Sequence, residues 1–272
     1  MDRSSSLRCR CQSVQPPKIR ARLERHTIFS CPECTLAWTT PPPGPIKYEQ
    51  GDFHQCVDSS ANAVPSVSQL PGEWQNSLRL QVELLKKHLK PGAHVHEVGS
   101  GRGLALQLFR EAGFSVSAVE PSERAAAIAQ QQGFAVETGY FGAGNRIATA
   151  DCVVFSHVLE HIAEPEAVLD HAADLVGDGY LLFFQTHYPG WIPRIFVRHW
   201  AWIPDEHFWH FTPKALDGWL ARVGFSRVEL CYVPLVQGNW KTKLVRNLAS
   251  LIPPAQDGFI ALYRRNPPPP NP

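Results

Sequence analysis

The sequence reads His96-Glu97-Val98-Gly99-Ser100-Gly101-Arg102-Gly103 across one short turn. Residues 94–98 form a pattern that predicts a strand, and a helical pattern follows the turn and continues to Ala112. Glycines at such a junction let the backbone approach a ligand where a side chain would clash. The spacing is Gly-x-Gly-x-Gly with Leu at position 104, which departs from the Gly-x-Gly-x-x-Gly of dinucleotide-binding proteins. By itself, the stretch also fits a tight connection that binds no ligand.

Strand and helix patterns alternate on both sides of this turn. The predicted strands are 94–98, 115–120, 134–138, 151–158, 180–186, 225–233 and 259–264. The predicted helices are 73–90, 122–132, 165–176 and 213–223, besides the one that follows the turn. The strand over 151–158 is nearly all apolar, as expected for a strand buried on both faces. This alternation predicts an α/β fold with a doubly wound sheet.

Two glutamates near the turn indicate which kind of ligand it binds. Glu97 ends the first predicted strand, and Glu120 ends the second, 21 residues beyond Gly99. From that second position a carboxylate can accept hydrogen bonds from both hydroxyls of a ribose. S-adenosylmethionine fits these acids, because its ribose suits Glu120 and its amino group suits the region of Glu97. Taken singly, either glutamate is more often a solvated strand end.

The combined motifs resemble those of class I S-adenosylmethionine-dependent methyltransferases. The segments that carry the resemblance are 97–103, 118–122, 151–162 and 205–213, followed by Leu216 and Gly224-Phe225. The resemblance covers about residues 73–234 and implies a Rossmann-like, seven-stranded sheet with a reversed last strand. The residues that it places around the cofactor are Glu97, Gly99, Ser100, Gly101, Gly103, Glu120, Pro121, Ser156 and His157.

One stretch departs from the family pattern. Many members have an acidic residue after the third strand that holds the adenine amine. Here this stretch reads Thr138-Gly139-Tyr140-Phe141 and has no carboxylate. Backbone groups or aromatic packing are expected to serve instead.

Four of the seven cysteines lie within the first 34 residues, as Cys9-x-Cys11 and Cys31-x-x-Cys34 with 19 residues between the pairs. Two cysteine pairs about 20 residues apart fit a tetrahedral thiolate site for Zn²⁺. A small, basic, proline-rich segment buries little core, so a metal would supply its folding free energy. A site closed by four sulfurs is expected to be structural. The alternative is four unrelated reduced thiols, and the one-residue gap of the first pair departs from the usual knuckle.

The chain of 272 residues is therefore expected to have four parts. They are a zinc-knuckle segment 1–45, a linker or cap 46–72, an S-adenosylmethionine-binding domain 73–266 and a disordered tail 267–272. This arrangement, with a tyrosine such as Tyr48, resembles sugar C-methyltransferases and their relatives. Those enzymes carry a further large C-terminal domain that this sequence does not contain. The expected acceptor is therefore a small molecule, either a sugar or another metabolite.

Histidines and aromatic residues are concentrated between His187 and His210. They form either a partly buried aromatic lid or a substrate cap over the methyl donor. The resemblance to the sugar enzymes places a catalytic pair at Glu206 and His207, with His207 as the base. A structural histidine is the alternative there. A metal site at His207 and His210 is not favoured, because no carboxylate–histidine spacing lies nearby, and His161 is expected to pack on the following helix.

Composition excludes several classes of protein. The net charge is +1, from 26 basic and 25 acidic residues, which gives no general case for nucleic-acid binding. No apolar run approaches the roughly 18 residues of a membrane helix, and the N-terminus lacks the apolar core of a signal peptide. We expect a cytoplasmic protein with no membrane partner, and its oligomeric state is not specified by the sequence.

Three functions stay open at this point. The leading hypothesis is a methyltransferase that uses S-adenosylmethionine on a small molecule. A second is an RNA-modifying or RNA-binding protein in which the basic cysteine segment contacts phosphates, although the balanced overall charge argues against it. A third is a binding module that keeps the S-adenosylmethionine site without catalysis.

Overall fold

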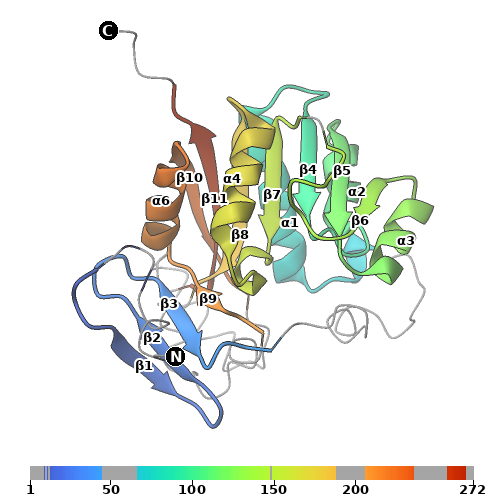
Figure 1. Cartoon of the computed structure of the whole chain (residues 1–272). Coiled ribbons are helices and arrows are strands. Elements are labelled where there is room, and N and C mark those ends of the chain that lie inside the picture. The colour runs from blue at the N-terminus through green and yellow to red at the C-terminus, as the bar shows by residue number, and fades with distance from the viewer. Residues whose placement is uncertain are drawn as a thin grey trace, which may run out of the picture.

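A computed structural model describes residues 9, 11, 13–44, 66–147, 149–187, 206–235 and 256–267 (Figure 1). Most of the predicted linker, the aromatic residues between Tyr188 and Trp202, Tyr48 and all but the first residue of the predicted tail lie outside these ranges. The predicted division of the chain into four parts stays a prediction.

A seven-stranded sheet forms the centre of the larger part of the molecule. Its order is β10-β11-β8-β7-β4-β5-β6. The strands are β4 (His94–Val98), β5 (Ser115–Glu120), β6 (Ala135–Thr138), β7 (Cys152–Ser156), β8 (Tyr180–Thr186), β10 (Phe225–Val233) and β11 (Gly258–Arg265). Strand β11 runs antiparallel to both of its neighbours, whereas the pairs from β8 to β6 are parallel. The predicted α/β class and the reversed last strand are therefore confirmed.

Helices cover both faces of this sheet (Figure 1). They are α1 (Gly72–His88), α2 (Leu104–Glu111), α3 (Glu123–Gln131), α4 (Pro165–Val176) and α6 (Pro213–Arg222), with the 3₁₀ turns η4 (Val67–Gln69) and η5 (Leu159–His161). Apolar residues of α4 and α6 form one core with β7, β8 and β11. Those of α1 and α2 form a second core on the other face, which α3 extends over β5 and β6. None of the helices that the structure describes is long and apolar enough to span a membrane.

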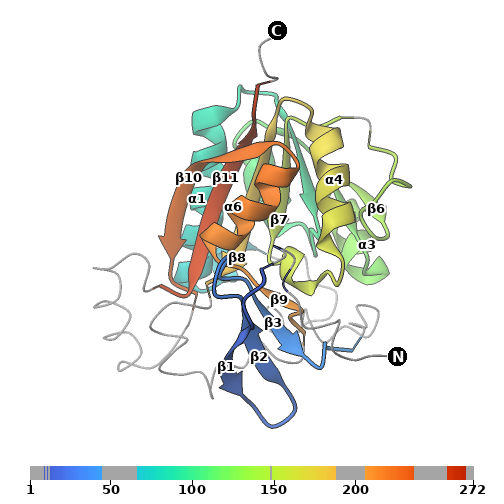
Figure 2. The same ribbon diagram turned by 60° about the vertical axis from the view of Figure 1, so that its left-hand side comes forward.

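A smaller sheet lies at the end of the large sheet to which the arrowheads of β4 and β7 point (Figure 1). It has the order β1-β2-β3-β9. The first three strands are β1 (Lys18–Arg22), β2 (Thr27–Ser30) and β3 (Ala37–Thr40), all from the cysteine-bearing segment. The fourth, β9 (Trp209–His210), lies between β8 and α6 in the chain and pairs antiparallel with β3 (Figure 2). The N-terminal segment is thus completed by a strand from the larger domain.

Candidate functional site

The glycine turn between β4 and α2 has a left-handed backbone at its three glycines. Gly99, Gly101 and Gly103 have φ angles of 70°, 54° and 86°. A Cβ atom on Gly99 would lie 2.7 Å from Cγ2 of Val158, and one on Gly103 would lie 3.2 Å from the Phe134 ring. Only glycine therefore fits at these two positions without strain or a shift of neighbours.

Two buried carboxyl groups flank this turn. Glu97 and Glu120 are each 3% exposed. Oε2 of Glu120 accepts the backbone N–H of Gly101 at 2.7 Å, and its Oε1 accepts that of Ser122 at 2.8 Å. Each carboxylate oxygen has a second lone pair, so both remain able to accept a further donor.

Glu97 is less satisfied than Glu120. Its Oε2 is buried and has no hydrogen-bond partner among the residues that the structure describes. Burial, reinforced by the nearby Glu120, raises the pKa of Glu97 to about 8. Burial also raises the pKa of Glu120, against the two N–H donors that lower it. The turn therefore lies beside two acids that a positively charged ligand would stabilise.

The end of β7 contributes the other predicted cofactor residues. Ser156 donates to Oε1 of Gln81 at 2.9 Å, which connects the strand to the buried face of α1. His157 has φ of 53°, a left-handed conformation that is uncommon for a residue with a Cβ atom. Its ring lies 5.3 Å from that of Trp74 and 4.2 Å from that of Phe184. Pairing of β4 with both β5 and β7 puts Gly99, Glu120 and Ser156 at one edge of the sheet.

The 3₁₀ turn after β7 brings a further acid into this region. Glu160 is fully buried, and its Oε1 lies 3.3 Å from Nδ1 of His157. Burial alone would raise the pKa of Glu160, but the hydrogen bond from His157 and the neighbouring histidines lower it to about 2. Glu160 is thus a buried, ionised carboxylate.

The predicted catalytic pair lies next to Glu160. His207 is 3% exposed, and burial lowers its pKa well below the ordinary value. Glu206 is partly buried, and its backbone oxygen lies 3.2 Å from Nδ1 of His161. His161 therefore contacts the segment before β9, and its expected packing on the following helix stays a prediction. The catalytic roles of Glu206 and His207 stay a prediction.

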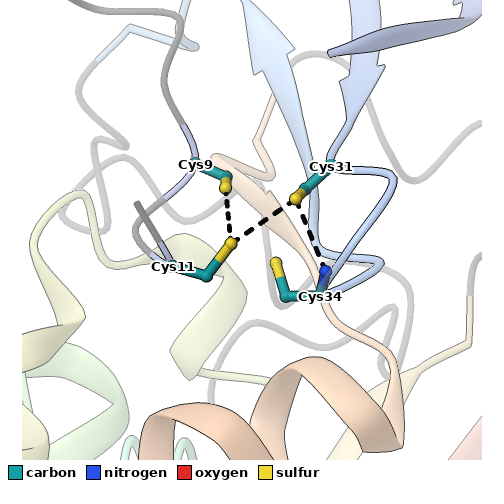
Figure 3. A group of neighbouring side chains, drawn as sticks. All are labelled: Cys9, Cys11, Cys31 and Cys34. Atoms are coloured by element: carbon teal, nitrogen blue, oxygen red, sulfur yellow. Dashed lines mark hydrogen bonds between the residues drawn. The ribbon is translucent and has the colours of Figure 1, made fainter. Parts of the chain in front are cut away.

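The four N-terminal cysteines converge as their spacing predicts (Figure 3). Sγ of Cys11 lies 2.9 Å from that of Cys9 and 3.5 Å from that of Cys31, and all four sulfurs lie within 4.8 Å of one another. A tetrahedron with Zn–S bonds of about 2.3 Å has sulfur–sulfur edges of about 3.8 Å, so this cluster fits Zn²⁺. The backbone N–H groups of Glu33 and Cys34 both point to Sγ of Cys31 at 3.4 Å.

Polar contacts join the cysteine segment to β9 and its flanks. The hydroxyl of Thr39 lies 2.9 Å from Nε2 of His210. The backbone N–H of Thr39 donates to the backbone oxygen of Phe208 at 3.1 Å. Thr35 and Thr212 bring their hydroxyls to 2.6 Å. Trp38, Trp209 and all four of these cysteines pack in one apolar cluster. The segment therefore reaches the region of His207.

The stretch after β6 contains no carboxylate that could accept from an adenine amine, and the acid just before it is already engaged. Glu137 on β6 accepts from Asn145 and from the N–H of Arg146. Tyr140 is 74% exposed, whereas Phe141 packs between the rings of His96 and His171. The expectation of backbone or aromatic contacts to adenine stays a prediction.

Residues 68–230 match a protein family described as methyltransferase domain. The chain belongs to this methyltransferase domain family. A curated relative, the ubiquinone biosynthesis O-methyltransferase of Idiomarina loihiensis, is 26% identical over 151 residues. The match covers 46% of this chain and 61% of that relative, so the chain spans less than two thirds of its length. The predicted resemblance to class I methyltransferases is confirmed.

Solved structures of other methyltransferase domains share the fold. Magnesium protoporphyrin IX methyltransferase from Synechocystis PCC 6803 with bound S-adenosylmethionine is 17% identical, with a TM-score of 0.55 over 80% of this chain and 93% of that one. The 1,6-didemethyltoxoflavin-N1-methyltransferase of Burkholderia thailandensis, with its acceptor and S-adenosylhomocysteine, is 18% identical, with a TM-score of 0.55 over 92% and 99%. At such identities the likeness shows the fold.

Sequence reasoning missed two polar residues of this methyltransferase domain. Gln81 lies on the same face of α1 as Leu78 and Leu85, and its isolation within that apolar face is a signal that could have found it. Glu160 belongs to a stretch that carried the family resemblance, but its partner His207 lies 47 residues further along the chain. Only the pairing of segments in space brings these two together.

Proposed function

We propose that this protein transfers the methyl group of S-adenosylmethionine to a small-molecule acceptor. The observation that carries the proposal is the buried Oε2 of Glu97, which has no partner in the described part of the chain and lies beside a left-handed glycine turn. A cationic amino group near Glu97 would supply the missing partner. The family to which the chain belongs supports the same ligand.

The residues around the turn fit this ligand in distinct ways. Gly99 and Gly101, both with positive φ, would border the methionine part, and Ser100 adds a buried hydroxyl that has no hydrogen-bond partner within the described ranges. Glu120, already held by two backbone N–H groups, would accept from the ribose hydroxyls, with Pro121 beside it. Gly103 would hold the turn close to α3, and Ser156 and His157 would border the sulfonium from β7.

The bound cofactor supplies an activated methyl group, and the chain supplies position. Methyl transfer requires that the acceptor atom lies in line with the sulfonium at near-attack distance. The aromatic and histidine-rich surroundings of His157 and Trp74 would exclude water from that line. We propose a small metabolite as the acceptor, with a sugar as one candidate class, and we place the protein in the cytoplasm.

We also propose a structural Zn²⁺ held by Cys9, Cys11, Cys31 and Cys34. The sulfur separations support this proposal, as does the small size of the sheet that these residues hold. The strands β1, β2 and β3 bury few apolar residues of their own. A metal would therefore supply folding free energy to the segment that pairs with β9.

Calorimetric titration with S-adenosylhomocysteine tests the cofactor site. We expect saturable heat from the purified protein, whereas no binding up to about 1 mM would contradict the proposal. Glu120→Ala should weaken binding by about 1–3 kcal/mol, or roughly 5- to 150-fold. Glu123→Ala is a matched control, because Glu123 is an exposed glutamate three residues away.

Transfer of a labelled methyl group to metabolites in a cell extract tests catalysis. A labelled small molecule that disappears with Glu120→Ala supports the enzyme. Binding of S-adenosylhomocysteine without any transfer would favour the non-catalytic module. Label in RNA, with binding that weakens steeply as salt increases, would favour the RNA-directed alternative.

A further inference from the structure

Three ionisable side chains meet between η5 and the segment before β9. They belong to Glu160, His161 and His207, which are 0%, 9% and 3% exposed. One ligand atom from each side chain lies within 4.8 Å of the others. The two imidazole rings have centroids 4.7 Å apart and are nearly perpendicular, at 84°. A carboxylate and two imidazoles therefore share a small volume with little access to water.

Backbone contacts hold the two segments in this arrangement. The N–H of Phe208 donates to the backbone oxygen of Glu160 at 2.9 Å. The indole N–H of Trp209 donates to the backbone oxygen of Ile162 at 2.9 Å. One bond thus starts next to His207, and the other ends next to His161. The three side chains are consequently positioned by both segments rather than by one flexible loop.

Two of the three side chains have buried polar atoms without a partner. Oε2 of Glu160 and Nδ1 of His207 make no hydrogen bond within the part of the chain that the structure describes. A buried polar atom without a partner costs free energy, and the cost is larger when the group is charged. A cation between these atoms would remove both costs at once.

Two of the three side chains also make the hydrogen bonds that metal-binding side chains usually make with their surroundings. Nδ1 of His161 faces the backbone oxygen of Glu206 at 3.2 Å. Oε1 of Glu160 faces Nδ1 of His157 at 3.3 Å, which leaves Oε2. Imidazoles that bind metals commonly donate their second N–H to a carbonyl or carboxylate, and ligating carboxylates are themselves hydrogen-bonded.

The geometry points to a second metal site, formed by Glu160, His161 and His207, that takes a divalent cation such as Zn²⁺. Two imidazoles and one carboxylate are a known ligand set for Zn²⁺, and they leave a fourth position for water or another oxygen. The site is chemically distinct from the four-cysteine cluster, because its ligands are nitrogen and oxygen. It does not depend on the proposed methyl transfer.

The second site and a catalytic base at His207 exclude each other. An imidazole that binds a metal through one nitrogen carries a proton on the other, so it has no lone pair left to accept one. A single set of measurements therefore decides which role His207 has.

Titration of the metal-free full-length protein with Co²⁺ tests the site. Cobalt bound by thiolates has strong charge-transfer absorption, whereas cobalt bound by nitrogen and oxygen has only weak visible bands. We expect two cobalt ions per chain, of which one lacks the thiolate bands. A Cys31→Ser, Cys34→Ser double variant should lose the thiolate bands and keep the weak ones.

Glu160→Gln keeps the shape of the side chain and removes its charge. It should weaken the second cobalt at least about tenfold and leave the thiolate bands unchanged. His94→Gln is the control, since His94 begins β4 at the end of the sheet away from the cluster. One cobalt per chain with only thiolate bands, or a second cobalt that Glu160→Gln does not weaken, would overturn the proposal. If Glu160→Gln fails to fold, the number of cobalt ions bound per wild-type chain still tests the proposal.

Discussion

The hydroxyl of Thr39 and Nε2 of His210 lie 2.9 Å apart, although 171 residues separate them in the chain. Both groups are buried, so this bond joins the cysteine segment to β9 in a place that water does not reach. The same strand begins two residues after His207.

Thr39→Val should destabilise the protein by about 1–3 kcal/mol, because it leaves a nitrogen of buried His210 without this partner. In a domain of this size the change corresponds to a loss of roughly 2–12 °C in melting temperature. Thermal unfolding followed by circular dichroism measures it. Thr27→Val, in the neighbouring strand β2, is the control, because it makes the same substitution at a threonine that does not bond to His210. It should melt like the wild type. Equal effects of the two variants would show that the bond contributes nothing.

Removal of the metal proposed at the four cysteines should loosen the N-terminal sheet. Cys31→Ser is expected to lose the metal measured by mass spectrometry and to expose residues 13–44 to limited proteolysis, because β1, β2 and β3 have little core of their own. Cys152→Ser is the control, since Cys152 is buried in β7, apart from the cluster. Full protease resistance of a metal-free Cys31→Ser protein would contradict a structural metal.

Gly99→Ala should weaken S-adenosylhomocysteine binding and lower stability, because the new Cβ would lie 2.7 Å from Cγ2 of Val158 at a φ of 70°. The backbone strain alone costs about 1–2 kcal/mol. Adding Val158→Ala removes the clashing methyl groups, so the double variant should recover part of the loss but not the strain. No recovery in calorimetry or thermal unfolding would rule out contact with Val158 as a cause.

The stability contribution of Glu97 should depend on pH. Burial, with a further effect of Glu120, raises its pKa from 4.5 to about 8. Between these two pH values the folded protein keeps a proton that the unfolded chain releases. The contribution of Glu97 to the free energy of unfolding is therefore fully present below about pH 4.5 and is lost as the pH rises to about 8. Glu97→Gln should therefore melt higher than the wild type at pH 8, with a smaller difference at pH 5. Glu123→Gln should show no such trend.

The same proton provides a test of the ligand contact. If an ammonium group binds beside Glu97, the carboxyl must ionise, and binding at pH 7 should release a proton. Titrations with S-adenosylhomocysteine in two buffers of different ionisation enthalpy measure this release. It should be absent in Glu97→Gln, and its persistence there would assign the proton to another group.

The regular part of the fold was predictable from local patterns. Residues 94–98, 115–120, 180–186 and 225–233 are strands with the predicted bounds, and α4 spans the predicted 165–176. The caps also follow the sequence, since Ser122 and Thr212 each accept the N–H that their position requires. These elements have strong periodicity and local signals at their ends.

The smaller sheet could not be predicted in the same way. Strand β9 has only two residues, Trp209 and His210, within an aromatic run that has no alternation. Its pairing with β3 depends on a contact between residues far apart in the chain, and local patterns contain no such information. Glu160 and His207 were missed as neighbours for the same reason.

The pairing of β3 with β9 also sets an order of events during synthesis. Strand β3 leaves the ribosome first, and its partner follows some 170 residues later, after about 9–34 s at ordinary translation rates. During that interval β3 is an unpaired sheet edge, which is a hazard for aggregation. Early metal capture by the four cysteines would keep this edge folded until β9 emerges, so zinc supply during growth should affect the yield of soluble protein more than the stability of finished molecules.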